Sequence, residues 1–454
     1  MMNREIFREY DIRGTVGEDL TDEVVTSIGK AVATYMKERG KRAATIGRDC
    51  RLSSEHFRDL LIDSMVKGGL DVTDLGTVPT PLFYFSLFNL EADGGVMVTG
   101  SHNPPEFNGF KVAFDKTTLY GPEIQHLADI IEEKRFVRGE GSYREYPYIV
   151  RDYYEFLRGN LKLEKSLKVV VDAGNGTAGV IACPIMGEMG QKVIPLFCDM
   201  DGHFPNHFPD PTVEKNVETL RKTVIDKGAD VGIGYDGDGD RIGAVDEKGN
   251  IIWGDYLMII FAREMLKEHK GASFVSEVKC SKNLYNEIEK QGGKAVMWKA
   301  GHSLIKKKMK EVNAILGGEM SGHMFFADKF FGYDDAIYAS LRLLEIMGKR
   351  YIPLSQYLSD LPKTYSTPEI RVDCPEKMKF GVVQALTDQY KQKFPIIDID
   401  GVRVSLPDGW GLVRASNTQP ILVLRFEADT GPGLERIQSM IMSDLERIMK
   451  EQRT

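Results

Sequence analysis

The chain has 454 residues, of which 42% are hydrophobic and 9% aromatic, a composition typical of a soluble protein that buries sizeable cores. Its formal net charge of -8 argues against nucleic acid or an anionic membrane as the main partner, because both select basic surfaces. No apolar run approaches the roughly 18 residues of a membrane span, and this length favours about three domains.

Five cysteines are scattered along the chain without a Cys-x-x-Cys pair: Cys50, Cys183, Cys198, Cys280 and Cys374. This pattern suggests neither a disulfide framework nor a zinc site, and it is typical of a reducing compartment. The first residues, Met-Met-Asn-Arg-Glu-Ile-Phe-Arg, are too charged for a secretory signal peptide. We therefore expect a cytoplasmic protein.

Three β-α-β units are predicted along the chain. In the first, strands over 43–46 and 70–75 flank a helix over 53–67 that ends at Gly68-Gly69. A second unit covers 168–197 and has a helix that ends near Gly190. The third covers 272–298, where a helix from Ser281 ends at Gly292-Gly293. These units predict three related α/β domains with mostly parallel mixed sheets.

The last part of the chain has a different pattern, which predicts a C-terminal α+β domain. Candidate strands alternate there with two amphipathic helices, the strands over 369–372, 402–405, 411–413 and 421–427 and the helices over 377–393 and 432–450. Linker-like stretches near 138–148, 247–254 and 353–368 divide the chain into predicted domains 1–147, 148–250, 251–362 and 363–454.

Four polar loops each follow a strand-like run, and the first contains Ser101. This loop, Thr-Gly-Ser-His-Asn-Pro-Pro over 99–105, follows the apolar run 95–98. Open α/β sheets bind ligands at the carboxyl ends of their strands, so Ser101 is a candidate nucleophile or phosphoryl carrier. Taken alone, the loop is better interpreted as an ordinary Ser/Asn/Pro turn.

The second loop contains Asp236, Asp238, Asp240 and Arg241 and follows the run 231–235. Three carboxylates on alternate residues of a Gly-rich loop converge well on one hard divalent cation, and their charge is hard to justify without it. The aspartates and Glu247 also match four ligand positions of a calcium-binding EF-hand. That loop, however, needs Gly where Arg241 stands, and it needs flanking helices. A solvated acidic turn is the remaining alternative.

The third and fourth loops suit a sugar phosphate. The third, over 318–323, places Glu319 near Ser321 for hydrogen bonds to sugar hydroxyls, and His323 adds a donor. The fourth, over 414–420, combines a guanidinium, hydroxyls and an amide as in a phosphate cradle. Each of these loops would pass for an ordinary polar turn in isolation.

A dinucleotide-binding fingerprint is also matched formally, by Gly174, Gly176 and Gly179 after a strand, with Asp199 further on. A hydride-transfer enzyme would leave the acidic triplet, the serine loop and the C-terminal phosphate loop unexplained. We keep the oxidoreductase as a distant alternative and favour glycines that allow tight strand-to-helix packing.

Together the loops supply a serine, a metal triad, a sugar reader and a phosphate cradle, which are the parts needed for phosphoryl transfer on a sugar phosphate. The chain resembles the α-D-phosphohexomutases, and most of all their phosphomannomutase/phosphoglucomutase branch. The matching segments follow the family's order over nearly the whole chain: 10–14, the Ser101 loop, 109–111, the Asp236 loop, 300–302, 318–323 and 414–420.

This resemblance implies four domains around a central cleft, with Ser101 phosphorylated and Mg²⁺ held by Asp236, Asp238, Asp240 and a phosphate oxygen on Ser101. It implies that the phosphoryl group passes between Ser101 and a hexose 1- or 6-phosphate. A hexose 1,6-bisphosphate intermediate turns end for end in the cleft. Lys111 is then the general base and acid, a role that requires ready loss of its proton. An edge-strand lysine in solvent is the alternative.

The other implied residues fall into two groups. Those that stabilise the transferring phosphoryl group or assist the proton are Arg13, His102, Arg241 and His302. Those that hold the substrate are Tyr10, Lys279, Glu319, Ser321, His323, Arg414, Ser416, Asn417 and Thr418.

Glucose and mannose phosphates are both expected as substrates, because such a sugar loop tolerates either configuration at C2. Met320 and the pair Asn417-Thr418 fit this branch better than the phosphoglucosamine mutases, which are the nearest alternative and for which Gln and Gly are expected. The expected partners are small sugar phosphates, and the expected state is a monomer or small homo-oligomer.

Overall fold

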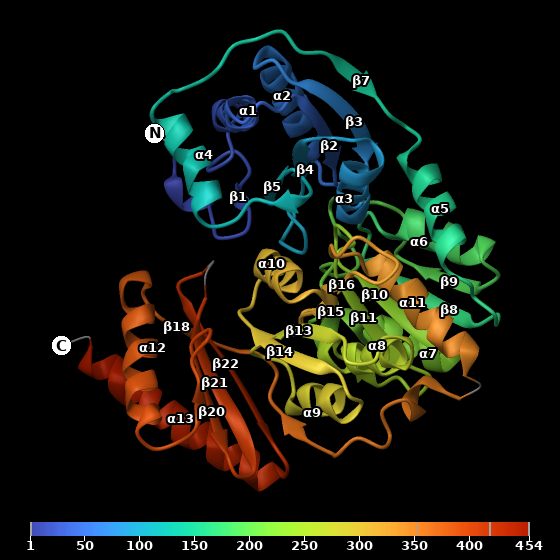
Figure 1. Ribbon diagram of the computed structural model, residues 1–454, viewed down its shortest axis with the longest axis vertical. Helices are drawn as coiled ribbons and strands as arrows, with labels where there is room; N and C mark the ends of the chain where they lie inside the picture. The colour runs from blue at the N-terminus through green and yellow to red at the C-terminus, as the bar shows by residue number, and fades with distance from the viewer. Residues whose placement is uncertain (1, 351, 417–418, 453–454) are drawn as a thin grey trace.

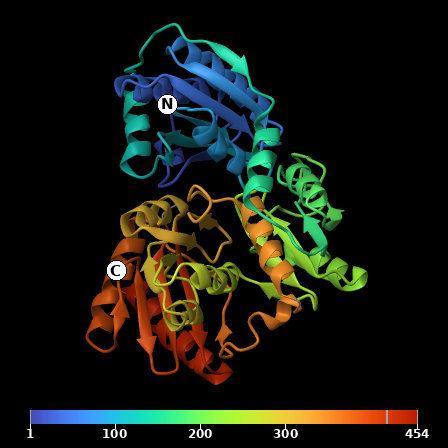
Figure 2. The same cartoon turned by 45° about the vertical axis from the view of Figure 1, so that its right-hand side comes forward.

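A computed structural model describes residues 2–350, 352–416 and 419–452. Figure 1 shows the chain as an arc of four parts, from the blue N-terminal domain through green and yellow to the red C-terminal domain. The N-terminal and C-terminal parts lie at the two ends of this arc, and they remain apart in the turned view of Figure 2. The predicted class of three α/β domains and a C-terminal α+β domain is confirmed by the four sheets.

One strand order is repeated in the first three sheets. The orders are β3-β2-β4-β5, β9-β8-β10-β11 and β14-β13-β15-β16. In each sheet the first three of these strands are parallel and the fourth is antiparallel. The turn between the last two strands therefore occupies the same place in each domain. These turns contain Ser101, Asp236 and Glu319, so three of the four predicted loops are equivalent in topology.

The N-terminal domain adds strands and helices around this repeat. Its elements, with the helix that leads to the next domain, are η1 (Arg4–Ile6), β1 (Ile12–Thr15), α1 (Asp22–Glu38), β2 (Ala43–Arg48), α2 (Ser54–Lys67), β3 (Asp71–Thr77), α3 (Thr80–Asn89), β4 (Gly94–Val98), β5 (Phe107–Phe114), β6 (Thr117–Thr118), α4 (Pro122–Glu132), β7 (Tyr143–Glu145) and α5 (Ile149–Asn160).

The second and third domains follow. The second contains β8 (Lys168–Asp172), α6 (Gly179–Glu188), β9 (Lys192–Leu196), η2 (Glu214–Val217), α7 (Glu218–Lys227), β10 (Val231–Tyr235), β11 (Ile242–Asp246) and β12 (Ile251–Ile252). The third contains α8 (Gly254–Glu268), β13 (Ser273–Glu277), α9 (Lys282–Lys290), β14 (Lys294–Trp298), α10 (His302–Val312), β15 (Ala314–Gly318), β16 (Met324–Phe326), α11 (Ala336–Lys349) and η3 (Leu354–Gln356).

The C-terminal domain is an antiparallel sheet covered by two helices. Its sheet order is β17-β22-β21-β20-β19, and β18 also pairs with β22. The elements are β17 (Tyr365–Ser366), β18 (Ile370–Asp373), α12 (Glu376–Lys391), β19 (Ile396–Ile397), β20 (Val402–Leu406), β21 (Gly409–Ala415), β22 (Ile421–Ala428) and α13 (Gly431–Glu451).

The predicted β-α-β units are confirmed, with boundaries that differ by one to three residues. Helix α9 begins after Ser281, whose side chain accepts a hydrogen bond from the N–H of Asn283 and caps the helix. Gly69 and Gly190 end their helices with φ of +88° and +86°. At the third stop Gly292 has the positive φ, +82°, whereas its neighbour Gly293 does not.

Apolar packing separates the C-terminal domain from the other three. One buried cluster runs through the first three domains, from Leu82 on α3 through Val169 on β8 to Leu341 on α11. The C-terminal domain has its own core, and a small cluster of Val278, Trp410 and Leu412 joins it to the third domain. The five cysteines all lie in the described ranges, and none of them forms a disulfide. Among the helices in the described ranges, none is both long and apolar enough to cross a bilayer.

Candidate active site

Ser101 lies in the turn between β4 and β5, where it faces the second domain. Its side chain is buried, and its backbone is left-handed with φ of +51°. The Ser101 N–H donates to Thr99 Oγ1 (2.8 Å). The Ser101 hydroxyl donates to Asp236 Oδ2 across the domain boundary (3.0 Å), and His102 Nδ1 lies 3.1 Å from the same hydroxyl. The predicted nucleophile and the first predicted metal ligand are therefore in direct contact.

The three aspartates converge in the turn between β10 and β11, and each is 0% exposed. One carboxylate oxygen from each lies within 4.8 Å of the others. Asp236 Oδ1 accepts the N–H groups of Asp240 (3.0 Å) and Arg241 (3.1 Å), which fixes the loop. Within the described residues, Asp238 Oδ1 and Asp240 Oδ1 are buried without a hydrogen-bond partner. Clustered carboxylate oxygens with orphaned atoms fit a hard divalent cation such as Mg²⁺.

Lys111 on β5 reaches this acidic cluster from the first domain. The alternative of an edge-strand lysine is wrong, because β5 lies between β1 and β4 and Lys111 is 5% exposed. Its Nζ donates to Asp238 Oδ2 (2.7 Å) and to Asp240 Oδ2. Burial alone would lower the pKa of Lys111, but the two carboxylates raise that pKa well above its ordinary value. In this arrangement the ammonium is held charged, unlike the ready proton loss expected of a base.

Thr80 is a contact of the aspartate loop that the sequence reasoning missed. It is the first residue of α3 and is fully buried. Its hydroxyl donates to Asp238 Oδ2 (2.6 Å), and its N–H donates to the Asp238 carbonyl (2.8 Å). The available signal was a threonine between two prolines just after a predicted strand, which is the same strand-end position that singled out Ser101.

A second missed residue, Asp334, joins the predicted histidines. His323 Nδ1 lies 3.1 Å and His302 Nδ1 3.9 Å from Asp334 Oδ2, and Lys306 Nζ lies 3.1 Å from Asp334 Oδ1. Arg241 Nε donates to His323 Nε2 (3.0 Å), so that nitrogen is the acceptor of the ring. Burial, followed by Lys306, lowers the pKa of His302 well below its ordinary value, so its ring is neutral near pH 7.

Arg13 and Tyr10 connect the first domain to the serine loop and to the third domain. Arg13 donates to Asn103 Oδ1 (2.7 Å) and to Asp11 Oδ2 (2.5 Å). The Tyr10 hydroxyl donates to the Ala300 carbonyl (2.8 Å), and the Tyr10 ring lies 5.7 Å from the ring of His302. The predicted residues of the 10–14 segment therefore border the same site.

The basic neighbours of Ser101 also affect His102. Burial, followed by the charges of Arg241 and Arg13, lowers the pKa of His102 well below its ordinary value. His102 is therefore neutral near pH 7 and offers Nδ1 or its proton to the serine hydroxyl, depending on its tautomer.

The sugar loop lies in the turn between β15 and β16. Glu319 is buried, and its Oε1 accepts the N–H of Gly301 (2.7 Å), while Ser321 is half-buried. Lys279 does not stand free, because its Nζ lies 3.1 Å from Glu369 Oε2 in the C-terminal domain. Lys279 lowers the pKa of Glu369 to about 2. This pair links the third and fourth domains beside the loop.

Arg414 anchors the fourth loop against the third domain. Its Nε donates to Asp400 Oδ2 (2.9 Å), and the same oxygen accepts the N–H of Ala300 (3.0 Å). The Ser416 carbonyl accepts a bond from Lys379 Nζ (2.6 Å). Asn417 and Thr418 lie outside the described residues.

Comparisons with known proteins agree with this geometry. Family models of phosphoglucomutase/phosphomannomutase match the chain in order: alpha/beta/alpha domain I over 4–138, domain II over 151–249, domain III over 253–365 and the C-terminal domain over 369–443. The phosphomannomutase/phosphoglucomutase of Pseudomonas aeruginosa is 46% identical over 444 residues, which cover 98% of this chain and 96% of the relative. This chain belongs to the phosphoglucomutase/phosphomannomutase family.

Two further relatives support the membership. The phosphoglucomutase of Neisseria meningitidis serogroup A is 43% identical over 448 residues and covers 98% of this chain and 97% of its own. A crystal structure of a phosphoglucomutase/phosphomannomutase family protein from Burkholderia thailandensis aligns with a TM-score of 0.93 at 40% identity. The match covers 99% of this chain and 98% of that one. The chain is thus a phosphohexomutase, an enzyme of the isomerase class.

The calcium-binding EF-hand and the dinucleotide-dependent oxidoreductase are both wrong for this mutase. The aspartate loop joins antiparallel strands, and Glu247 bonds instead to Ser355, so an EF-hand is excluded. The fingerprint glycines serve packing: a Cβ on Gly176 would lie 2.6 Å from the Gly237 carbonyl, and one on Gly179 would lie 2.7 Å from Cys198 Cα. Side chains at these positions would push α6 away from the aspartate loop and from the end of β9.

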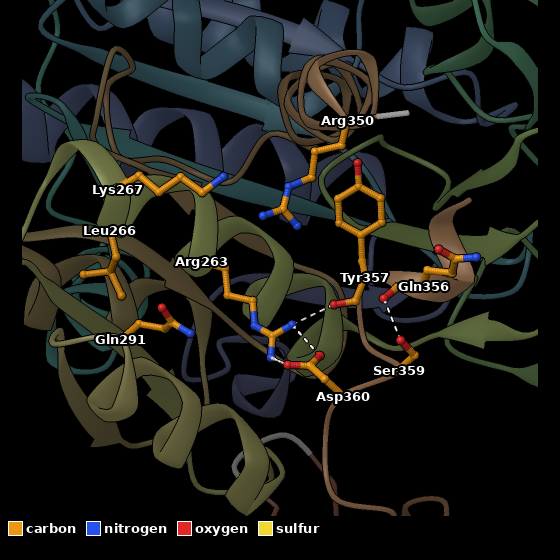
Figure 3. Close-up of a pocket in the computed structure, with 9 residues that line it drawn as sticks. All are labelled: Arg263, Leu266, Lys267, Gln291, Arg350, Gln356, Tyr357, Ser359 and Asp360. Atoms are coloured by element: carbon orange, nitrogen blue, oxygen red, sulfur yellow. Dashed lines mark hydrogen bonds and ion pairs between the residues drawn. The ribbon is translucent and has the colours of Figure 1, made fainter. Parts of the chain in front are cut away.

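The mutase also has a surface hollow of about 440 Å³ away from these loops (Figure 3). It is lined by α8, by Gln291 and Arg350, and by residues of the 356–360 segment. Arg263, which lines the hollow, pairs with Asp360 (2.9 Å) and donates to the Tyr357 carbonyl (2.7 Å). The Arg263 guanidinium is therefore already paired with neighbouring residues of the chain.

Proposed function

We propose that this enzyme interconverts the 1- and 6-phosphates of glucose and mannose through a phosphorylated Ser101 and a hexose 1,6-bisphosphate. The observation that carries the proposal is the hydrogen bond from Ser101 Oγ to Asp236 Oδ2 (3.0 Å), which places the serine at the edge of the acidic cluster. A phosphoryl group on that oxygen would lie beside the proposed metal ligands.

In this proposal Asp236, Asp238 and Asp240 hold Mg²⁺ together with a phosphate oxygen on Ser101. The cation supplies charge neutralisation and polarisation of the phosphoryl group. Arg241 and Arg13 are both half-buried; they border the serine loop and offset the charge of the transferring group. His102 and His302 are neutral donors or acceptors on the two sides of the site.

Lys111 exchanges a proton with the reacting sugar hydroxyl in this proposal. Its Nζ is held 2.7 Å from Asp238, so the proton is stored at a fixed place beside the serine loop. The pKa of Lys111 is raised by its carboxylate partners, so the group stands ready as an acid. To act as a base it must first weaken those contacts.

The remaining predicted residues would recognise the sugar and the phosphate that does not react. Glu319 and Ser321 hold hydroxyls that both orientations of the bisphosphate present, and Tyr10, His323 and Lys279 surround them. Arg414, Ser416, Asn417 and Thr418 grip the distal phosphate from the C-terminal domain. We propose the boundaries 1–147, 148–250, 251–362 and 363–454 for the four domains, which work in the cytoplasm as a monomer or small homo-oligomer.

The test is a side-by-side assay of glucose, mannose and glucosamine 1-phosphates with Mg²⁺ and catalytic glucose 1,6-bisphosphate. We expect turnover of the first two sugars, loss of activity on chelation with EDTA, and recovery when Mg²⁺ is restored. Turnover of the amino sugar alone would overturn the substrate assignment. Full activity after exhaustive chelation would overturn the metal assignment.

A further inference from the structure

Arg51, in the connection between β2 and α2, lies beneath the serine loop and is not one of the residues implied by the family resemblance. Its side chain is 0% exposed. Nη1 donates to the carbonyls of Pro104 (2.7 Å) and Phe107 (2.9 Å). Nη2 donates to the carbonyls of Ser101 (2.9 Å) and Asn103 (2.5 Å). The fork of one guanidinium thus holds four carbonyls, three in the loop that contains Ser101 and one at the start of β5.

Asp49 fixes the guanidinium from the other side. Its Oδ2 lies 3.2 Å from Arg51 Nε and also accepts the Gly100 N–H (3.2 Å). The loop approaches so closely that a Cβ on Gly100 would lie 2.5 Å from Arg51 Nε. Both peptide groups beside Ser101 are therefore set from the first domain, because Arg51 holds the Ser101 carbonyl and Thr99 holds the Ser101 N–H.

The Ser101 carbonyl also touches the aspartate loop. A Cβ on Gly237 would lie 2.4 Å from the Ser101 oxygen, so the Ser101 carbonyl is packed between Arg51 and the backbone between two proposed metal ligands. The second domain covers Arg51 as well, because the ring of Phe204 lies 5.1 Å from its Cζ. Arg51 therefore stands at the point where the serine loop is placed relative to the aspartate loop.

We propose that Arg51 is a positioning residue for phosphoryl transfer. It holds Ser101 in its left-handed conformation and keeps Oγ aligned with Asp236 and with the incoming hydroxyl, and it touches neither substrate nor metal itself. This proposal rests on the proposed function, since it concerns the transfer step at Ser101. A lysine at this position keeps the charge but presents one nitrogen, which cannot span four carbonyls.

The test compares Arg51→Lys with the matched control Arg48→Lys. Arg48 is the last residue of β2, next to this connection, and its guanidinium makes a long 3.5 Å contact with the Asp49 carbonyl and a 3.6 Å contact with Glu55. Each protein is phosphorylated with glucose 1,6-bisphosphate, and single-turnover transfer to glucose 6-phosphate is followed by the loss of phosphate from the intact-protein mass. Steady-state kcat and KM and the melting transition are measured on the same samples.

For Arg51→Lys we expect transfer and kcat about 10²-fold below wild type, with KM for the sugar phosphate within about threefold because its proposed contacts lie on other loops. Arg48→Lys is expected to keep the wild-type rate of transfer and the wild-type kcat. Loss of binding alone, with kcat unchanged, would contradict the positioning role, as would transfer in Arg51→Lys equal to that of the control. If wild type is never phosphorylated at Ser101, the proposed function itself fails, which is a different result.

A second variant leaves Arg51 in place and is decisive if Arg51→Lys does not fold. Gly100→Ala introduces a Cβ against the guanidinium, at 2.5 Å from Nε in the present arrangement. The loop or the arginine must then move, and we expect the same split, with a fall in kcat and transfer and little change in KM. Transfer in Gly100→Ala equal to wild type would overturn the proposal.

Discussion

The serine turn of β4–β5 and the aspartate turn of β10–β11 occupy the same place in two copies of one sheet, yet they are held in opposite ways. A buried cation, Arg51, binds the serine turn through its carbonyls. Backbone N–H groups bind the aspartate turn through the Asp236 carboxylate, and Lys111 and Thr80 reach it from the other domain. In the proposed function, the same turn therefore carries the phosphoryl carrier in one domain and the metal ligands in the next.

Neither turn is a site by itself. The Ser101 hydroxyl donates to Asp236 on the second domain. The aspartate turn in return accepts hydrogen bonds from the Lys111 ammonium and the Thr80 hydroxyl, both on the first domain. Because one strand order is repeated, equivalent turns from successive domains meet at a shared edge. The side chains on these turns differ from one domain to the next. The contacts that cross the domain boundary are the ones to disturb.

The largest effect is expected from Lys111→Met. Without the ammonium, activity should fall about 10³-fold, in the range of a lost general acid or base. The variant should also melt at a lower temperature than wild type in EDTA, since Asp238 and Asp240 would keep buried charges without a cation. Mg²⁺ should raise its melting temperature by more than it raises that of wild type, because a ligand that binds only the native state stabilises it.

The exposed Lys116 on the turn after β5 provides the control for this experiment. Lys116→Met should retain wild-type activity and the wild-type response to Mg²⁺. Activity of Lys111→Met within about tenfold of wild type would contradict its role as the proton carrier.

A smaller effect is expected from Thr80→Val. The near-isosteric change removes the 2.6 Å bond to Asp238 Oδ2 and leaves the shape of α3 unaltered. Loss of such a supporting contact should weaken Mg²⁺ affinity about tenfold, measured by titrating activity in metal buffers. Thr45→Val is the control, because that buried hydroxyl contacts Ser86 in the first domain instead. Equal Mg²⁺ affinity in the two variants would show that Thr80 does not support the aspartate loop.

An effect on stability alone is expected at the third equivalent turn, whose neighbour Lys279 pairs with Glu369 of the C-terminal domain. The folded-state pKa of Glu369 is about 2, below the ordinary 4.5, so the unfolded chain binds more protons between these values. The pair therefore stabilises the fold above about pH 4.5, and this stabilisation is lost as pH falls toward about 2.

Glu369→Gln should accordingly lose about 2 kcal/mol of stability near neutral pH. Its melting temperature should converge with that of wild type as the solution is acidified. Glu376→Gln, at a carboxylate that is 64% exposed beside Lys379, should show little difference at any pH. A gap between Glu369→Gln and wild type that persists unchanged in acid would rule out the ion pair as its cause.

Local patterns in the sequence were sufficient to predict the repeat and the loops. Apolar spacing and glycine stops placed β2, α2 and their counterparts within a few residues, and strand-end positions singled out Ser101, the aspartates and Glu319. The residue types in these loops act through short-range chemistry, which a sequence displays directly. The same holds for Arg414, which stands at the end of β21 as a predicted phosphate ligand would.

The supporting residues could not be predicted in this way, because they act across long chain separations. Thr80 and Asp238 are 158 residues apart, and Lys111 and Asp240 are 129 apart. Arg51 bonds to carbonyls, which carry no sequence signature, and Asp334 is recognised only by the two histidines that it faces. The sequence interpretation also assigned Lys111 a readily lost proton, whereas the structure surrounds it with carboxylates that retain it.

The central claim is that Ser101 stores the phosphoryl group, and peptide mapping by mass spectrometry tests it most directly. Wild type and Ser101→Ala are incubated with glucose 1,6-bisphosphate and Mg²⁺, digested, and searched for phosphopeptides. We predict one phosphate on the peptide that contains Ser101 in wild type, its removal by excess glucose 6-phosphate, and none in the variant. A wild-type enzyme that turns over hexose phosphates with no phosphate on Ser101, or with phosphate on another residue, would contradict the account.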